Sequence, residues 1–172
     1  QLRVSSMKNV TFVSALFDID RVDGRKWDQY LKWFDETLKL RVPMLLFITE
    51  DLQEFIDERR GNLPTKTVHI TPEEIPYYHL KEPIQEILDS DDYKNNISDP
   101  DRIECKQAMY SVIQYSKFPW LDQAAKINPF DSDVYFWLDA GGSRFFNNFD
   151  LSEEYPGEAA MESIEGMGES FL

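Results

Sequence analysis

The stretch VTFVSALFDI, Val10 to Ile19, is a run of β-branched and aromatic residues with the length of a β-strand. From Arg25 to Leu40 the apolar residues recur at helical spacing and form one stripe, made of Trp27, Tyr30, Leu31, Phe34 and Leu38. A strand that leads into an amphipathic helix is the first part of a β-α-β unit, which is the unit from which parallel sheets are built.

The alternation of strand and helix patterns continues after Leu40. Pro43 to Thr49 is a second apolar strand, and Glu50 to Arg60 is a short helix that Gly61 ends. Thr65 to Thr71 is a third strand. Because parallel strands need crossover connections, these units predict an α/β fold with a mainly parallel, Rossmann-like sheet flanked by helices.

A fourth strand, Val134 to Leu138, is apolar on both faces and runs into Asp139, followed by Gly141 and Gly142. This pattern places the carboxylate at the C-terminal edge of a sheet, where open α/β sheets bind ligands. The glycines allow a close backbone approach or a positive φ, and Arg144 supplies a cation for phosphate. One carboxylate holds Mg²⁺ or Mn²⁺ only if the substrate adds oxygens, as a diphosphate does. The alternative is an Asp that caps a turn.

Between the third and fourth strands the sequence predicts three helices, of which the first is a short one over Pro83 to Leu88. A long helix is expected from Ser98 to about Lys117, and a short one from Trp120 to Ile127. Four polar or basic residues of the long helix fall within one arc: Lys106, Tyr110, Gln114 and Lys117. Such a stripe is typical of a solvated helix face.

Composition limits the kinds of partner. The 172 residues, 42% of them apolar, suffice for one core. The net charge is −14 and no basic stripe is present, which argues against nucleic acid and anionic membranes as partners. The single Cys105 fits a reducing compartment, and no apolar run of membrane-spanning length or signal peptide is found. We therefore expect a cytoplasmic protein with no membrane span.

The C-terminal residues are strongly acidic. After Arg144 there is no Lys or Arg, while Asp and Glu recur from Asp150 to Glu169. The pattern predicts a domain over residues 1–150 and an acidic tail over residues 151–172. The alternative is an amphipathic helix from Glu158 to Phe171, although two glycines weaken its helical propensity.

Four motifs, taken in order, resemble those of a known family. They are SALFDIDR at Ser14 to Arg21, YLKWF at Tyr30 to Phe34, Tyr110 with Ser116-Lys117, and FWLDAG at Phe136 to Gly141. Over residues 10–146 the chain resembles the HtrL/YibB-like family of predicted glycosyltransferases. The resemblance implies a GT-A-like fold that binds a nucleotide-sugar donor and transfers the sugar to a glycan or another hydroxyl acceptor.

The resemblance also implies roles for individual residues. In GT-A-like enzymes a short acidic motif, commonly D-x-D, holds a divalent metal on the donor diphosphate; here Asp139 would hold Mn²⁺ or Mg²⁺, with Gly141 in place of the second carboxylate. No catalytic base is assigned. The expected donor-binding residues are Ser14, Ala15 and Leu16 beside the base, Asp18 and Arg21 at the ribose or diphosphate, Gly141 in the loop, and Lys117 and Arg144 on the departing diphosphate.

Two other classes of function remain open. The sequence FDIDRV, Phe17 to Val22, resembles the D-x-D-x-V loop of haloacid-dehalogenase-like phosphatases, in which Asp18 would attack phosphorus. Thr49 and Lys117 would then be the phosphate-binding hydroxyl and lysine of that family. Its late pair of metal-binding acids is absent, because Asp139 is followed by Ala-Gly-Gly. The third class is a non-catalytic nucleotide-binding module.

Overall fold

The computed structural model describes residues 9–22, 24–147 and 150–169, and within these ranges it contains one sheet. The strand order is β3-β2-β1-β4, and every neighbouring pair is parallel. The strands are β1 (Val10–Leu16), β2 (Met44–Ile48), β3 (Thr65–His69) and β4 (Val134–Trp137). The predicted α/β fold with a parallel sheet is therefore confirmed.

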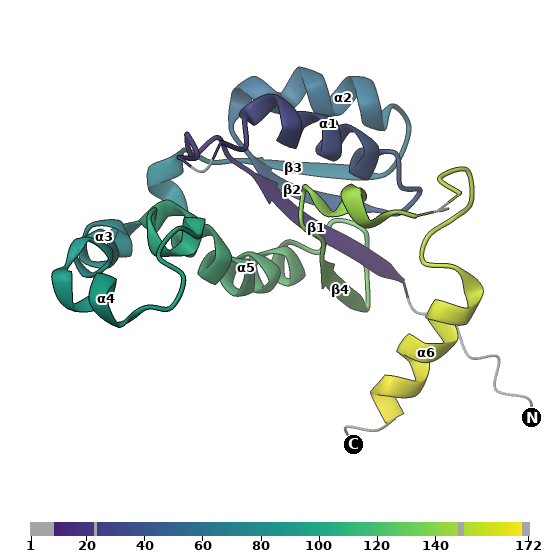
Figure 1. Ribbon diagram of the computed structural model, residues 1–172. Coiled ribbons are helices and arrows are strands. Elements are labelled where there is room, and N and C mark those ends of the chain that lie inside the picture. The colour runs from purple at the N-terminus through teal and green to yellow at the C-terminus, as the bar shows by residue number, and fades with distance from the viewer. Residues whose placement is uncertain (1–8, 23, 148–149, 170–172) are drawn as a thin grey trace, which may run out of the picture.

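Helices cover both faces of the sheet (Figure 1). α1 and α2 pack on one face, and α5 lies against the other. The helices are α1 (Trp27–Leu38), α2 (Gln53–Arg60), α3 (Lys81–Asp89), α4 (Asp91–Asn96), α5 (Ala108–Ile127) and α6 (Glu158–Glu169). Short 3₁₀ turns are η1 (Glu50–Leu52), η2 (Pro72–Glu74), η3 (Tyr78–Leu80), η4 (Ile103–Cys105) and η5 (Gly142–Phe145).

β1 lies at the centre of the core and is buried along its whole length. Because alternate side chains of a strand point to opposite faces, Phe12 and Leu16 pack toward α1, while Val13 and Ala15 pack toward α5. On the α5 side the fully buried Trp120 stacks on three other rings, with centroid distances of 5.7 Å to Phe17, 5.5 Å to Phe47 and 5.8 Å to Trp137. These aromatic contacts join α5 to β2, to β4 and to the residue that follows β1.

α5 differs from the two helices expected in its place. It is one continuous helix that contains Pro119, and it begins at Ala108, after turns and η4. Proline removes one backbone donor from a helix interior but does not end this helix. Val112, Ser116, Trp120 and Ala124, spaced four residues apart, are all buried. This stripe presses both halves of the helix against the sheet, so tertiary packing outweighs the local cost of the proline.

The acidic C-terminal segment forms a helix over most of its length. Residues Glu158–Glu169 make α6, as in the alternative that the sequence left open. Met161 on α6 is only 7% exposed and belongs to the core cluster of α1. Before the helix, the ring of Tyr155 lies edge-on to Phe12 at 5.3 Å, and its backbone N–H donates to the carbonyl of Arg41. Residues 170–172 lie outside the described residues, and the domain division at residue 150 stays a prediction.

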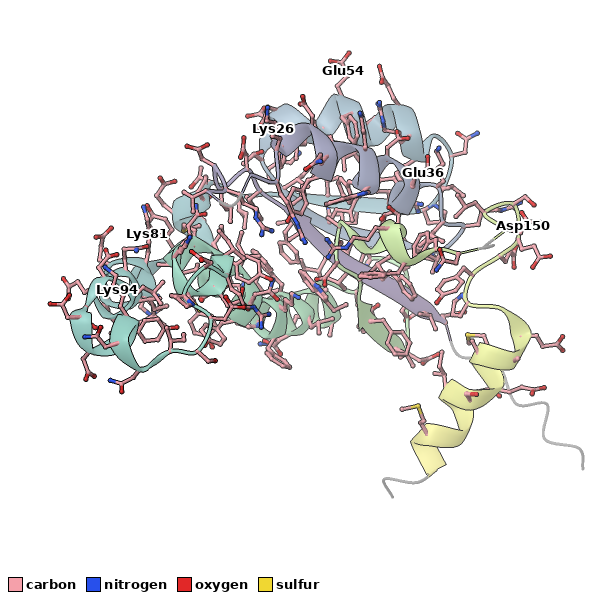
Figure 2. All side chains as sticks on the ribbon, viewed as in Figure 1. Lys26, Glu36, Glu54, Lys81, Lys94 and Asp150 are labelled. Carbon is pink, nitrogen blue, oxygen red and sulfur yellow. The ribbon has the colours of Figure 1, made fainter. Side chains whose placement is uncertain are left out.

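Charged side chains lie mainly on the outer surface of the molecule. The six that Figure 2 labels, Lys26, Glu36, Glu54, Lys81, Lys94 and Asp150, all point away from the sheet. α5 is the longest helix among the described residues, but it carries Lys117, Asp122 and Lys126. None of the described helices combines the length and the apolar character needed to cross a membrane.

Candidate functional site

A cleft opens at the carboxyl ends of β1 and β4. Because the two strands are parallel neighbours, the residues that follow Leu16 and Trp137 emerge at the same edge of the sheet. The cleft encloses about 870 Å³, including the part open to solvent. Its walls come from both strand ends, the start of α1 and the first half of α5: Ala15, Leu16, Phe17, Asp18, Ile19, Arg21, Arg25, Trp27, Tyr30, Tyr110, Ile113, Gln114, Lys117, Trp137, Asp139, Ala140, Gly141 and Arg144.

The structure brings together nearly all of the site residues expected from the sequence. Eight of the nine line this cleft: Ala15, Leu16, Asp18, Arg21, Lys117, Asp139, Gly141 and Arg144. Ser14 is the exception. It is 2% exposed and pairs with Leu46 inside the sheet. The reason is that β1 continues to Leu16, two residues beyond Ser14, so Ser14 lies before the strand exit. Its Oγ has no hydrogen-bond partner in the described part of the chain.

The charge of the cleft is opposite to that of the protein. Among the described residues, its lining contains four cations, Arg21, Arg25, Lys117 and Arg144, and two carboxylates, Asp18 and Asp139, whose charges sum to +2. The whole chain carries −14. A concave site that gathers cations within an acidic protein concentrates positive potential and attracts anions. The cleft is therefore suited to an anionic ligand.

The guanidinium of Arg21 is held between two aromatic rings. It lies 5.5 Å from the ring centroid of Tyr30 on α1 and 5.3 Å from that of Tyr110 on α5. Its Nη1 also donates to the hydroxyl of Tyr30. Cation–π contacts of this kind help to hold a guanidinium in place. Helices from both faces of the sheet thus position one cation of the cleft.

The loop that carries Arg21 is fastened to α5 by Gln107. The Gln107 side-chain amide donates to the carbonyl of Ile19 and accepts from the backbone N–H of Val22 at 3.4 Å. Within the loop, Asp20 has a φ of +49° and its N–H donates to Asp18 Oδ1 at 2.9 Å. This turn is one that Asp residues form readily. The sequence did not single out Gln107, although it fixes the path of the strand exit.

Asp139 is held by two donors at the end of β4. Its Oδ1 accepts from Lys117 Nζ at 2.7 Å and from Trp137 Nε1 at 2.7 Å. Burial alone would raise the pKa of Asp139, but these hydrogen bonds and the charges of Lys117 and Arg144 outweigh it, so the pKa lies below its ordinary value of 3.8. Asp139 is therefore a carboxylate at neutral pH, and it anchors the ammonium of Lys117.

The residues around Asp139 fit a resident divalent metal poorly. Hard cations such as Mg²⁺ need several oxygen ligands. Gly141 stands where a second carboxylate would be, and no cluster of three candidate ligands occurs anywhere in the described residues. A metal on this carboxylate would also lie beside the Lys117 ammonium, which repels it. Metal binding at Asp139 stays a prediction.

The loop after Asp139 packs closely on α1. A Cβ added to Gly141 would meet the Trp33 ring at 3.3 Å, and the φ of Gly141 is −85°. The glycine is thus required for close packing and not for a positive φ. Ser143 Oγ donates to the carbonyl of Trp33 at 2.6 Å. The Arg144 guanidinium lies 5.1 Å from the centroid of the Trp33 ring, so the same packing places a cation at the cleft.

Sequence reasoning missed the aromatic walls and misread the α5 stripe. Tyr110, Gln114 and Lys117 line the cleft, whereas Lys106 pairs with Asp101 at 2.8 Å outside it. Topology offers the signal that was missed. Because α5 leads into the first residue of β4, its N-terminal half must lie at the carboxyl edge of the sheet, beside the strand ends.

Comparison with known proteins identifies a family without an assigned activity. No curated protein and no solved structure matches the chain significantly. A family described as "Bacterial protein of unknown function (HtrL_YibB)" matches residues 8–162, which span the sheet, the cleft and the first turn of α6. The chain therefore belongs to the HtrL_YibB family.

Proposed function

We propose that the protein is a glycosyltransferase that binds a nucleotide-sugar donor in the cleft and transfers the sugar to a hydroxyl of a glycan or another acceptor. One observation carries the proposal. At the carboxyl edge of a parallel sheet, a cleft with a net charge of +2 and aromatic walls lies within a protein of net charge −14. A nucleoside diphosphate combines the two complementary features, an anionic diphosphate and a flat aromatic base.

The donor diphosphate lies against the side-chain cations in this proposal. Arg21 and Arg144 present planar guanidinium groups, which match phosphate oxygens in pairs, and Lys117 adds a point charge. Asp18 is exposed at the strand end and can accept hydrogen bonds from ribose hydroxyls. Ala15 and Leu16 give the base an apolar wall. These roles agree with those expected from the sequence, except for Ser14.

The chemical step follows from where charge develops. The acceptor oxygen bonds to the anomeric carbon, and the bond from that carbon to the diphosphate oxygen breaks. The diphosphate takes the electron pair of that bond, and the hydroxyl proton passes to a base. Cations fixed before the reaction stabilise the growing charge at little reorganisation cost. Lys117 and Arg144 are suited to this role, because each is held by neighbouring side chains.

The phosphatase alternative receives less support from the geometry. Among the residues described as lining the cleft, Thr49 is absent, so the hydroxyl which that mechanism needs is not part of the cleft wall. Asp18→Asn separates the two classes. A phosphatase would lose all turnover and its native form would bind a fluoroberyllate mimic, whereas a transferase would lose only part of its donor affinity.

A thermal-shift screen tests the proposal. UDP-, GDP- and CDP-sugars are compared, each with and without Mn²⁺, beside p-nitrophenyl phosphate as a generic phosphatase substrate. A ligand that binds the folded state alone raises the melting temperature, and we expect one nucleotide series to do so. Sugar release from that donor supports a transferase. Stabilisation without release under any acceptor condition indicates the non-catalytic module, and no stabilisation by any nucleotide rejects the proposal.

A further inference from the structure

We infer that the cleft holds the donor diphosphate with side-chain cations alone, and that Asp139 is a positioning residue for Lys117 and not a metal ligand. The inference rests on the proposed function, because it concerns how the same donor is bound. It departs from the expectation that a divalent ion bridges Asp139 and the diphosphate.

The first support is the state of the Asp139 carboxylate. Lys117 and Trp137 both donate to the same oxygen, Oδ1, each at 2.7 Å. A metal bound through the other oxygen, Oδ2, would lie close to the Lys117 ammonium, which repels it. The second ligand of a D-x-D motif is missing, since Gly141 has no side chain. Asp139 is thus arranged as an acceptor for two donors.

The second support is the fixed position of Lys117. A lysine side chain is flexible, and a free one loses conformational entropy when it binds a phosphate. Here Asp139 accepts from its Nζ, and the Trp137 ring centroid lies 5.7 Å away. The side chain is 20% exposed, so most of it is packed. An ammonium has three N–H donors, so the bond to Asp139 leaves others for phosphate oxygens.

The third support is the balance of charge. The diphosphate of a nucleotide sugar carries one negative charge on each phosphate group. Over the part of the cleft lining that the structure describes, four cations and two carboxylates sum to +2, which is opposite in sign to the charge of the diphosphate. A divalent ion would raise the positive charge well above that of the ligand. The side chains therefore supply the neutralisation that a metal supplies in other donor sites.

Calorimetric titration of the full chain with UDP, GDP and CDP tests the inference. Each is titrated in EDTA and again in Mn²⁺ or Mg²⁺. We expect the nucleotide that binds to do so in EDTA, with a Kd within about threefold of its value with metal. Binding that requires the metal overturns the inference but leaves the proposed function intact. No binding in either condition rejects the proposed function itself.

Substitution of Lys117 tests whether its ammonium contacts the diphosphate. Lys117→Met removes a hydrogen bond from a charged donor, and we expect it to weaken metal-free binding by roughly 10- to 150-fold. Lys126→Met is the matched control, because Lys126 lies on the same helix and pairs with Asp122 on the exposed side. Equal affinity of the Lys117 and Lys126 variants contradicts the inference. Should Lys117→Met fail to fold, the EDTA comparison on the native protein still decides.

Substitution of Asp139 separates a positioning role from a metal ligand. Asn keeps an Oδ1 that accepts from Lys117 and Trp137, but it lacks the charge that a metal ligand needs. We expect Asp139→Asn to bind nucleotide in EDTA within about threefold of the native protein. Asp139→Ala, which loses the acceptor, should bind more weakly than Asp139→Asn. Loss of metal-dependent binding in Asp139→Asn would show that the carboxylate is a metal ligand.

Discussion

Arg60 offers a sharp test of what holds the sheet together away from the cleft. The residue is 3% exposed, and burial lowers the pKa of its guanidinium to about 10, so it is charged at neutral pH. It donates five hydrogen bonds, which reach the carbonyls of Leu38, Leu40, Val42 and Pro64 and the hydroxyl of Thr65 at 2.7 to 3.1 Å. One side chain thus joins the end of α1 to the starts of β2 and β3.

Arg60→Met leaves these acceptors without their donor. The carbonyl of Leu40 still accepts from the backbone N–H of Val42 at 3.0 Å. Leu38 and Val42 are almost completely buried, so water cannot replace the guanidinium at their carbonyls. At the low end of about 1 kcal/mol for each unsatisfied group, these two carbonyls give a loss of about 2 kcal/mol. For a chain of this size that loss lowers the melting temperature by about 4–8 °C. Nucleotide affinity should not change, because the site lies at the opposite edge of the sheet.

Differential scanning calorimetry measures the effect, with Arg59→Met as the control. Arg59 is the neighbouring arginine, but its side chain is 29% exposed and its main partners are the surface carboxylates of Asp35 and Glu58. We expect Arg59→Met to cost at most about 1 kcal/mol. Equal melting temperatures for the two variants would show that burial of the acceptors does not decide the effect, since that burial is the difference between the two arginines.

Three further predictions concern the cleft. Arg21→Met should weaken nucleoside diphosphate binding by roughly 10- to 150-fold in calorimetry. Arg21→Lys should recover only part of the lost affinity, because an ammonium lacks the planar shape of a guanidinium, and full recovery would argue against guanidinium recognition. Gln107→Leu should accelerate hydrogen exchange at residues 19–22, and unchanged exchange would mean that Gln107 does not hold the loop. The pKa of Asp139 is lowered, so the stabilisation from its pair with Lys117 is present above about pH 4 and is lost as the pH falls further. The melting-temperature difference between native protein and Asp139→Asn should therefore vanish at low pH, and a difference that persists there would contradict this.

The sequence predicted the sheet well because its signals are local. The apolar runs at Val10 to Ile19 and Val134 to Leu138 identify strands without knowledge of their neighbours. Once the crossovers are recognised, parallel pairing follows and brings Asp18 and Asp139 to one edge. The expected site residues therefore gathered largely as predicted, although their roles rest on experiments still to be done.

Features that depend on contacts distant in sequence were missed. α5 continues through Pro119 because Trp120 is stacked among rings from β2, β4 and the loop after β1, and no local pattern reveals that support. Tyr30 was predicted as part of a core stripe, yet its ring and hydroxyl hold Arg21 at the cleft. The pairing of Asp139 with Lys117 could not be predicted from the sequence either, because Lys117 lies 22 positions earlier, on a helix whose buried face the sequence does not specify.

Recognition of a diphosphate by fixed cations in the cleft can be measured by titrating the native protein with a nucleoside, its monophosphate and its diphosphate, using the base that stabilises it most. We expect affinity to rise with each added phosphate and the gain to fall with increasing salt. A nucleoside that binds as tightly as its diphosphate, or a gain that does not depend on salt, would contradict this expectation.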